Sequence, residues 1–303
     1  MKTKLFFLLS ILLCFTIIQC KTTSLKKEKS KDYRKYWLKI YEADSLYLIG
    51  EYENSFNIMD SLFEIYEPTN TPPYYEYETY LKVGHLSKKD ISKTKVKSLI
   101  ENYGYEIETF NVKTYPVLNE IFKASNISKR KYNKYRKKYL DKIDTILRKK
   151  IIQLKRLDQK ARSNPSNETR IKLMDSIDLE VEKFLMDIFS KNIFPNEHII
   201  GNHSIDKNSA IDISVLLLHT RDSIRLNYFI PLINSFVEEG KCLPTIYCEM
   251  IDQYQLYNDK EQIYGTYNVN QLDAKDYNSL REKVGLPSLE YQRWRYEKIL
   301  ESF

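Results

Sequence analysis

The sequence predicts a mainly α-helical protein, in which helical hairpins are followed by a helical domain with one small β-hairpin. The 303 residues include seven glycines and nine prolines, and long stretches lack both. Such stretches favour helices over many short strands. Apolar residues recur along them at steps of three to five, which is the pattern of amphipathic helices.

The N-terminal residues 1–19 are typical of a signal peptide. Lys2 and Lys4 precede an apolar run from Leu5 to Ile18. This run is shorter than the roughly 20 residues that a membrane-spanning helix needs. The sequence therefore predicts export and a location in the bacterial cell envelope.

The end of this segment, Ile17-Ile18-Gln19-Cys20, resembles a bacterial lipobox. The resemblance implies that the thiol of Cys20 is lipidated and that Cys20 becomes the new N-terminus. Gln19 stands where a small residue is usual, and the alternative is an ordinary cleaved signal. Lys21 stands where aspartate would retain the protein in the inner membrane. An anchor in the outer membrane, on its periplasmic or surface side, is the expectation.

Residues 20–35 are predicted to form a flexible tether, because they are polar and rich in lysine. Residues 36–126 are predicted to be helical, beginning with a hairpin over 36–67 that is broken at Gly50 and stopped by Pro68. A second hairpin is expected over 74–105. The spacing of about 34 residues between the two hairpins resembles a tetratricopeptide repeat. A helix near Pro116 completes this region.

The segment from Lys129 to Arg156 contains thirteen lysines and arginines against two aspartates. Its apolar residues recur at helical steps, which predicts one helix from Ser128 to Ala161 with a solvated basic face. The functional alternative is contact with lipid or lipopolysaccharide phosphates. An export signal argues against nucleic acid as a partner.

The remainder of the predicted domain, 127–303, contains further helices and a β-hairpin. Helices are expected over 169–191, 210–220, 224–239, 273–284 and 288–301. The β-hairpin is expected near 247–267, with strands Tyr247–Tyr257 and Gln262–Tyr267.

The sequence contains no pattern for a metal site or a cofactor. His198 and His203 have poor spacing for metal ligands, and no glycine-rich phosphate loop is present. Cys242 and Cys248 would meet an oxidising compartment, where they would form a disulfide or stay as two buried thiols.

Several segments between about 145 and 300 together resemble a family of bacterial domains known only as a domain of unknown function. They are Asp158-Gln159-Lys160-Ala161-Arg162, His219 at the end of an apolar helix, Gln262-Ile263-Tyr264-Gly265-Thr266, and a tail with Asp273, Arg281 and Val284-Gly285-Leu286-Pro287. Tetratricopeptide-like hairpins often precede this domain. The resemblance implies binding residues, namely Asp158, Gln159, Arg162, His219, Asp252, Gln262, Tyr264, Gly265 and Thr266. The sequence departs from the family pattern at Gln253, where arginine is usual, and at Tyr267, where glutamine is usual.

Two of these positions are also candidate catalytic residues. His219 follows a buried apolar run and is either a structural histidine that caps its helix or a general base, with Asp158, Asp222 or Asp252 to orient it. Asp158 and Arg162 lie four residues apart on one helix face and, if buried, would fix Gln262 or a bound polar group. Tyr264-Gly265-Thr266 is expected to be a strand whose glycine allows close approach of another backbone.

The sequence favours a non-catalytic function over an enzymatic one. The leading hypothesis is a lipid-anchored module that binds or assembles a protein, peptide or other envelope component, with no cofactor. The alternatives are a hydrolase-like enzyme that uses His219 and Asp158 on an envelope substrate, and a structural spacer.

Overall fold

The computed structural model describes residues 31–72, 74–106, 116–163, 167–206 and 211–301. The signal peptide and Cys20 lie outside the described residues. Asp32–Phe303 forms one compact unit. The predicted domain boundary at residue 126 stays a prediction.

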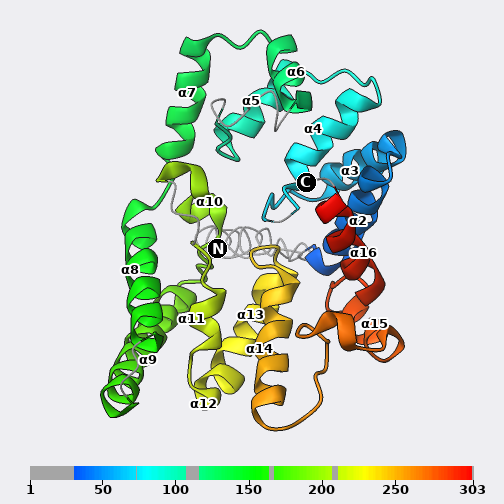
Figure 1. Ribbon diagram of the computed structural model, residues 1–303. Coiled ribbons are helices and arrows are strands. Elements are labelled where there is room, and N and C mark those ends of the chain that lie inside the picture. Colours follow the sequence, from blue (N-terminus) through cyan, green and yellow to red (C-terminus); the bar gives the residue numbers. More distant parts are fainter. Residues whose placement is uncertain (1–30, 73, 107–115, 164–166, 207–210, 302–303) are drawn as a thin grey trace, which may run out of the picture. The chain divides into compact units, whose positions relative to one another are not determined.

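The described residues are mainly helical, as the sequence predicts (Figure 1). The first helices are α2 Tyr33–Leu48, α3 Tyr52–Ile65, α4 Glu76–Leu86, α5 Lys93–Glu101 and α6 Pro116–Ala124. Asp32 caps α2, because its side chain accepts a hydrogen bond from the backbone of Arg34. The helix therefore begins inside the predicted tether, three residues before the predicted start at residue 36.

The two N-terminal hairpins form at the predicted places, but the predicted spacing between them is wrong. The second hairpin begins at Glu76, further from Tyr33 than a tetratricopeptide period of about 34 residues. The extra length lies in the connection after α3. The buried carboxyl of Glu76 organises this connection, since it accepts hydrogen bonds from the Tyr36 hydroxyl at 2.7 Å and the Asn70 backbone at 2.6 Å.

The basic segment forms two helices, α7 Lys129–Leu140 and α8 Thr145–Arg162, where one continuous helix was predicted. Asp144 explains the break. Its carboxylate caps α8 by accepting hydrogen bonds from the backbones of Ile146 and Leu147, at 3.1 and 2.8 Å. Its own N–H donates to the carbonyl of Ile199 at 2.9 Å. Ile146, in the first turn of α8, is 82% exposed.

The rest of the chain is built from helices of very different lengths. They are α9 Asn167–Ser190, α10 Glu197–Ile200, the 3-10 helix η2 His203–Ile205, α11 Ser214–Leu218, α12 Asp222–Ile224, the π-helix η3 Arg225–Phe229, α13 Ile230–Glu238, α14 Pro244–Tyr257, the 3-10 helix η4 Val269–Gln271, α15 Ala274–Lys283 and α16 Leu289–Glu301. The predicted helix over 210–220 shrinks to the five residues of α11.

The predicted β-hairpin is wrong, because the described residues contain no strand. Tyr247–Tyr257 belongs to α14, in which Pro244 occupies the first turn, and Cys248 and Asp252 are buried four residues apart. Gln262–Tyr267 is an irregular loop. The side chains of Asp252 and Gln262 accept hydrogen bonds from its backbone N–H groups, which a β-ladder would otherwise use.

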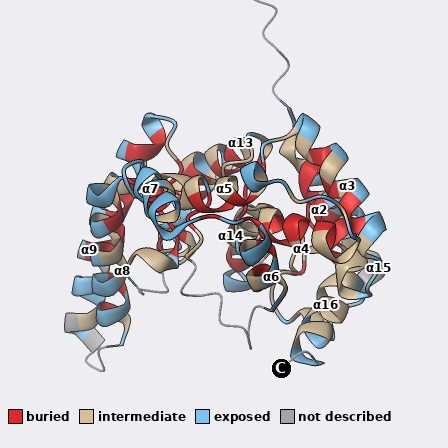
Figure 2. Ribbon diagram, turned by 90° about the horizontal axis from the view of Figure 1, so that it is seen from above, coloured by how far each residue is buried: buried red, intermediate tan, exposed pale blue. Residues whose placement is uncertain are grey.

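Three groups of buried side chains hold the compact unit together. One lies among α2 to α6 and includes Met59, Leu81 and Ile100. A second, which includes Leu154, Leu185 and Phe236, joins α8 and α9 to α11, α13 and α14. The third is formed mainly by aromatic residues of α2, together with Ile40 and with Leu62 of α3, and Leu243 and Tyr291 pack against it. The buried faces of these helices point inward in Figure 2. Within the described ranges, no helix has the length and apolar character that crossing a bilayer requires.

Candidate functional site

The side chains of Asp158 and His219, which are distant in the sequence, are in direct contact. Asp158 lies in α8 and is fully buried, and His219 is the C-cap of α11. The Nδ1 atom of His219 lies 2.9 and 3.0 Å from the two carboxylate oxygens of Asp158. The sequence names Asp158, Asp222 and Asp252 as possible partners of this histidine, and the structure places Asp158 there.

The surroundings of Asp158 favour its ionised form. Burial raises the pKa of its carboxyl, but the hydrogen bonds from His219 and Gln159 and the charge of Arg162 outweigh burial, so the pKa is lowered. Gln159 donates to the carboxylate at 2.7 Å, and Arg162 lies 3.2 Å from it. Arg162 also reaches Asp178 of α9 at 2.9 Å.

This arrangement determines which nitrogen of His219 carries a proton. An ionised carboxylate can only accept hydrogen bonds, so Nδ1 must be the donor to Asp158. In the neutral ring, Nε2 is then free to accept a proton. The side chain of His219 is 26% exposed, and no described residue hydrogen-bonds to Nε2. The pair has the arrangement of a general base with its orienting carboxylate, and it equally fits a structural helix cap.

The other predicted residues gather around Asp252 of α14, which is fully buried. One oxygen of its carboxylate accepts hydrogen bonds from the backbones of Ile263 and Tyr264, at 2.8 and 2.9 Å. The other oxygen accepts from the backbone and the hydroxyl of Thr266, at 2.9 and 2.8 Å. Asp252 therefore determines the conformation of the loop 262–267.

Gln262 closes the same loop and does not reach Asp158 or Arg162, contrary to the expectation from sequence. Its side-chain amide donates to the carbonyl of Tyr267 at 2.9 Å and accepts from the N–H of Tyr267 at 2.7 Å. Gly265 has a φ of +63°, and an added Cβ would lie 2.8 Å from Leu272. Its role is thus a left-handed turn against a side chain, where a strand glycine was predicted.

Arg281 of α15 ties this loop to the C-terminal tail. Its buried guanidinium donates to the carbonyls of Tyr264 and Pro287, at 2.7 and 2.6 Å, and to the side chain of Gln292 at 2.5 Å. Gly285 lets the tail approach α2, because a Cβ at this position would lie 2.9 Å from the Cα of Arg34. Most of the predicted motif residues of this group therefore hold the fold together.

Arg225, which the sequence analysis missed, connects the two groups. It is almost fully buried and donates to the carbonyl of Leu218 at 2.6 Å and to the side chain of Gln253 at 2.7 Å. Leu218 precedes His219, and Gln253 follows Asp252. Gln253 thus accepts a hydrogen bond from an arginine elsewhere in the chain. The position of Arg225 between Ile224 and Leu226 is the sequence signal that could have identified it.

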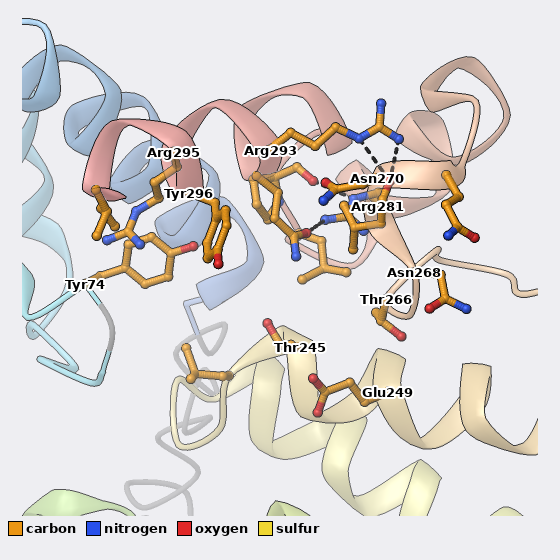
Figure 3. Close-up of a pocket in the computed structure, with 17 residues that line it drawn as sticks. Tyr74, Thr245, Glu249, Thr266, Asn268, Asn270, Arg281, Arg293, Arg295 and Tyr296 are labelled. Carbon is orange, nitrogen blue, oxygen red and sulfur yellow. Dashed lines mark hydrogen bonds between the residues drawn. The ribbon is translucent and has the colours of Figure 1, made fainter. Parts of the chain in front are cut away.

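A cleft of about 580 Å³ lies between α14 and α16, and we call it the α14–α16 cleft. Figure 3 shows Thr245 and Glu249 of α14 on one wall and Arg281, Arg293 and Asn270 across from them. Thr266 lies between these two walls, and Tyr74 and Tyr296 lie at one end. Of the predicted binding residues, only Thr266 lines this cleft. His219 and Asp158 line neither this cleft nor a neighbouring cleft of about 630 Å³.

Glu249 is the carboxyl-bearing residue of this cleft, and its side chain has no partner among the described residues. Within the described residues, its half-buried carboxyl has neither a hydrogen bond nor an ion pair. Burial, together with the charges of Asp212 and Asp252, raises its pKa to about 7. The neighbouring cleft of about 630 Å³ is also lined by Leu243, Thr245 and Glu249, so the two clefts share this part of α14. Because residues 247–257 were predicted to form a strand, the sequence did not indicate a role for Glu249.

Two further observations concern metals and thiols. No group of three or more histidine, cysteine, aspartate and glutamate side chains in the described chain is arranged to hold a metal ion. Cys242 and Cys248 are buried free thiols, and burial raises the pKa of both well above its ordinary value.

Comparisons with protein-family models, with curated proteins and with solved structures found no match to this chain. The resemblance to the domain of unknown function and to tetratricopeptide repeats therefore stays a prediction from the sequence.

Proposed function

We propose that the protein is a lipid-anchored module of the bacterial envelope that binds a peptide segment of a partner protein in the α14–α16 cleft. The observation that carries this proposal is the unpaired, half-buried carboxyl of Glu249. An unpaired polar group in a cleft costs stability, and a ligand that donates a hydrogen bond to it recovers that cost. An ammonium or amide group of a peptide has this chemistry.

The opposite wall offers the complementary charge. Arg293 donates to the backbone carbonyls of Val269 and Leu272, but no described carboxylate pairs with it. A carboxyl acceptor lies at one wall, and at the other lies a cation that interacts with the charge of Glu290 without forming an ion pair. This arrangement suits a peptide, which presents donors and carbonyl or carboxylate acceptors along one chain. The aromatic rings of Tyr74 and Tyr296 add apolar contact area at low entropic cost.

Site-specific photo-crosslinking in cells tests this proposal. A photoreactive amino acid at Thr245 reports on the cleft, and the same group at Lys260, in the exposed turn after α14, is the control. We expect a defined protein adduct from position 245 that is absent from position 260. Glu249→Gln and Arg293→Gln should each weaken the adduct while the protein stays folded. The same adducts from both positions, or adducts that neither substitution affects, would contradict the proposal.

A second candidate is a hydrolase-like enzyme, and the hydrogen bond between His219 and Asp158 is the observation that favours it. In this function Nε2 of His219 would take a proton from water, and Asp158 would orient the ring. Hydrolysis of p-nitrophenyl acetate by the wild type and by His219→Gln provides a first test. Equal rates would remove this candidate.

A further inference from the structure

Helix α7 presents a continuous cationic face. Its sequence, KRKYNKYRKKYL, contains no acidic residue. With 3.6 residues per turn, six of its cations fall within roughly 200° of the helix circumference. All six are exposed: Lys129, Arg130, Lys131, Lys134, Lys137 and Lys138. Arg136 and Tyr139 are buried on the opposite side.

Most of this charge is not neutralised by neighbours. Lys137 pairs with Asp141 at 2.8 Å, and Lys138 pairs with Glu101 at 2.9 Å. The remaining four cations make no ion pair with a residue that the structure describes. We call Lys129, Arg130, Lys131 and Lys134 the α7 quartet.

Two exposed apolar side chains follow this face in the chain. Leu140, the last residue of α7, is 40% exposed, and Ile146 in the first turn of α8 is 82% exposed. The tyrosines of α7 do not join them, because Tyr132 and Tyr135 are half-buried on the other side of the helix. Stacking platforms for nucleic-acid bases are therefore missing from the cationic face.

We propose that the cationic face of α7 docks on an anionic phospholipid surface. Lysine and arginine near such a surface gain favourable energy that adds from residue to residue. Exposed apolar side chains beside a basic helical face are typical of helices that lie at a membrane interface. The docking is independent of the α14–α16 cleft and does not require lipid at Cys20, although an anchor there would keep this face near a membrane.

Vesicle sedimentation with the compact unit, residues 32–303, tests this docking without the lysines of the tether. The unit should bind vesicles that contain phosphatidylglycerol, should not bind pure phosphatidylcholine, and should dissociate as salt is raised. Reversing the α7 quartet to glutamate should weaken binding at least about tenfold. The helix should survive this change, because acidic residues are favourable in the first turn.

The control variant reverses Lys160, Lys172, Lys183 and Lys260 to glutamate. These lysines are exposed, lie outside α7 and have no ion pair in the described part of the chain. The net charge of both variants is the same, so only position distinguishes them. Equal losses in the two variants would show that net charge alone drives binding and would overturn the proposal. Loss of binding to lipopolysaccharide micelles with unchanged vesicle binding would also overturn it.

Discussion

The carboxylate of Asp252 accepts both the backbone N–H and the hydroxyl of Thr266, at 2.9 and 2.8 Å. With the N–H groups of Ile263 and Tyr264, four donors converge on one buried carboxylate. A helix residue thus specifies the conformation of a loop that begins ten positions later in the chain. Thr266, which this contact holds in place, lines the α14–α16 cleft.

The first prediction concerns Asp252→Asn. The amide has two donors where the carboxylate has acceptors, so part of the buried loop backbone would lose its partner. We expect a loss of about 2–3 kcal/mol in the free energy of unfolding, because hydrogen bonds to a buried charge are strong. The midpoint of thermal unfolding should fall by several degrees. Asp259→Asn, at an exposed loop position, is the matched control. An unchanged midpoint for Asp252→Asn would contradict the role given to this carboxylate.

The sequence predicts the class of most elements around this contact, because periodicity and capping are local properties. The helix that begins at Tyr52 and the one that ends before Gly240 follow directly from spaced apolar residues and glycine stops. The prediction of a β-hairpin is wrong because the sequence pattern behind it is also local. Side chains of Asp252 and Gln262 take the hydrogen bonds that strands would exchange, and such tertiary contacts leave no periodic signal.

The sequence likewise predicts one part of the candidate site and misses another. The association of Asp158 with His219 was one of three pairings that the sequence allowed, and packing of α8 against α11 selects it. The sequence analysis missed Glu249, which matters because its carboxyl has no partner among the described residues. A missing partner is a property of the folded surroundings, so a single sequence cannot reveal it.

A second prediction separates the roles of Asp158 and His219. Asp158→Ala removes the acceptor for His219 and the partner of Arg162 in a fully buried position. We expect it to lower the free energy of unfolding by about 2–3 kcal/mol, because the donors of His219 and Gln159 lose a charged acceptor, while Arg162 keeps its ion pair with Asp178. His219→Ala should cost about 1 kcal/mol, because Gln159 and Arg162 still contact the carboxylate. Chemical denaturation of both variants measures the difference. A larger cost for His219→Ala would mean that the histidine, and not the carboxylate, holds this region.

A third prediction concerns the proposed lipid anchor. Replacement of Cys20 by alanine removes the only thiol that the lipobox resemblance assigns to lipid. The wild type should enter the detergent phase after phase separation of bacterial extracts, and Cys20→Ala should stay in the aqueous phase or with unprocessed precursor. Cys248→Ala, which removes a buried thiol, controls for loss of a cysteine as such. Wild-type protein in the aqueous phase would refute the anchor.

A fourth prediction follows from the unpaired carboxyl of Glu249. Its pKa is raised from 4.5 to about 7, mainly by burial. The folded protein therefore binds more protons than the unfolded chain between pH 4.5 and 7, and its stability falls as pH rises through this window. Glu249→Gln removes this cost, so the variant should be more stable than the wild type at pH 8, by about 1–3 kcal/mol. The difference should shrink as pH falls toward 4.5. Thermal unfolding of both proteins across this range measures it, and exposed Glu261→Gln is the control. A loss of stability at pH 8 would mean that the carboxylate has a partner in the folded protein, and the argument for a ligand at Glu249 would fail.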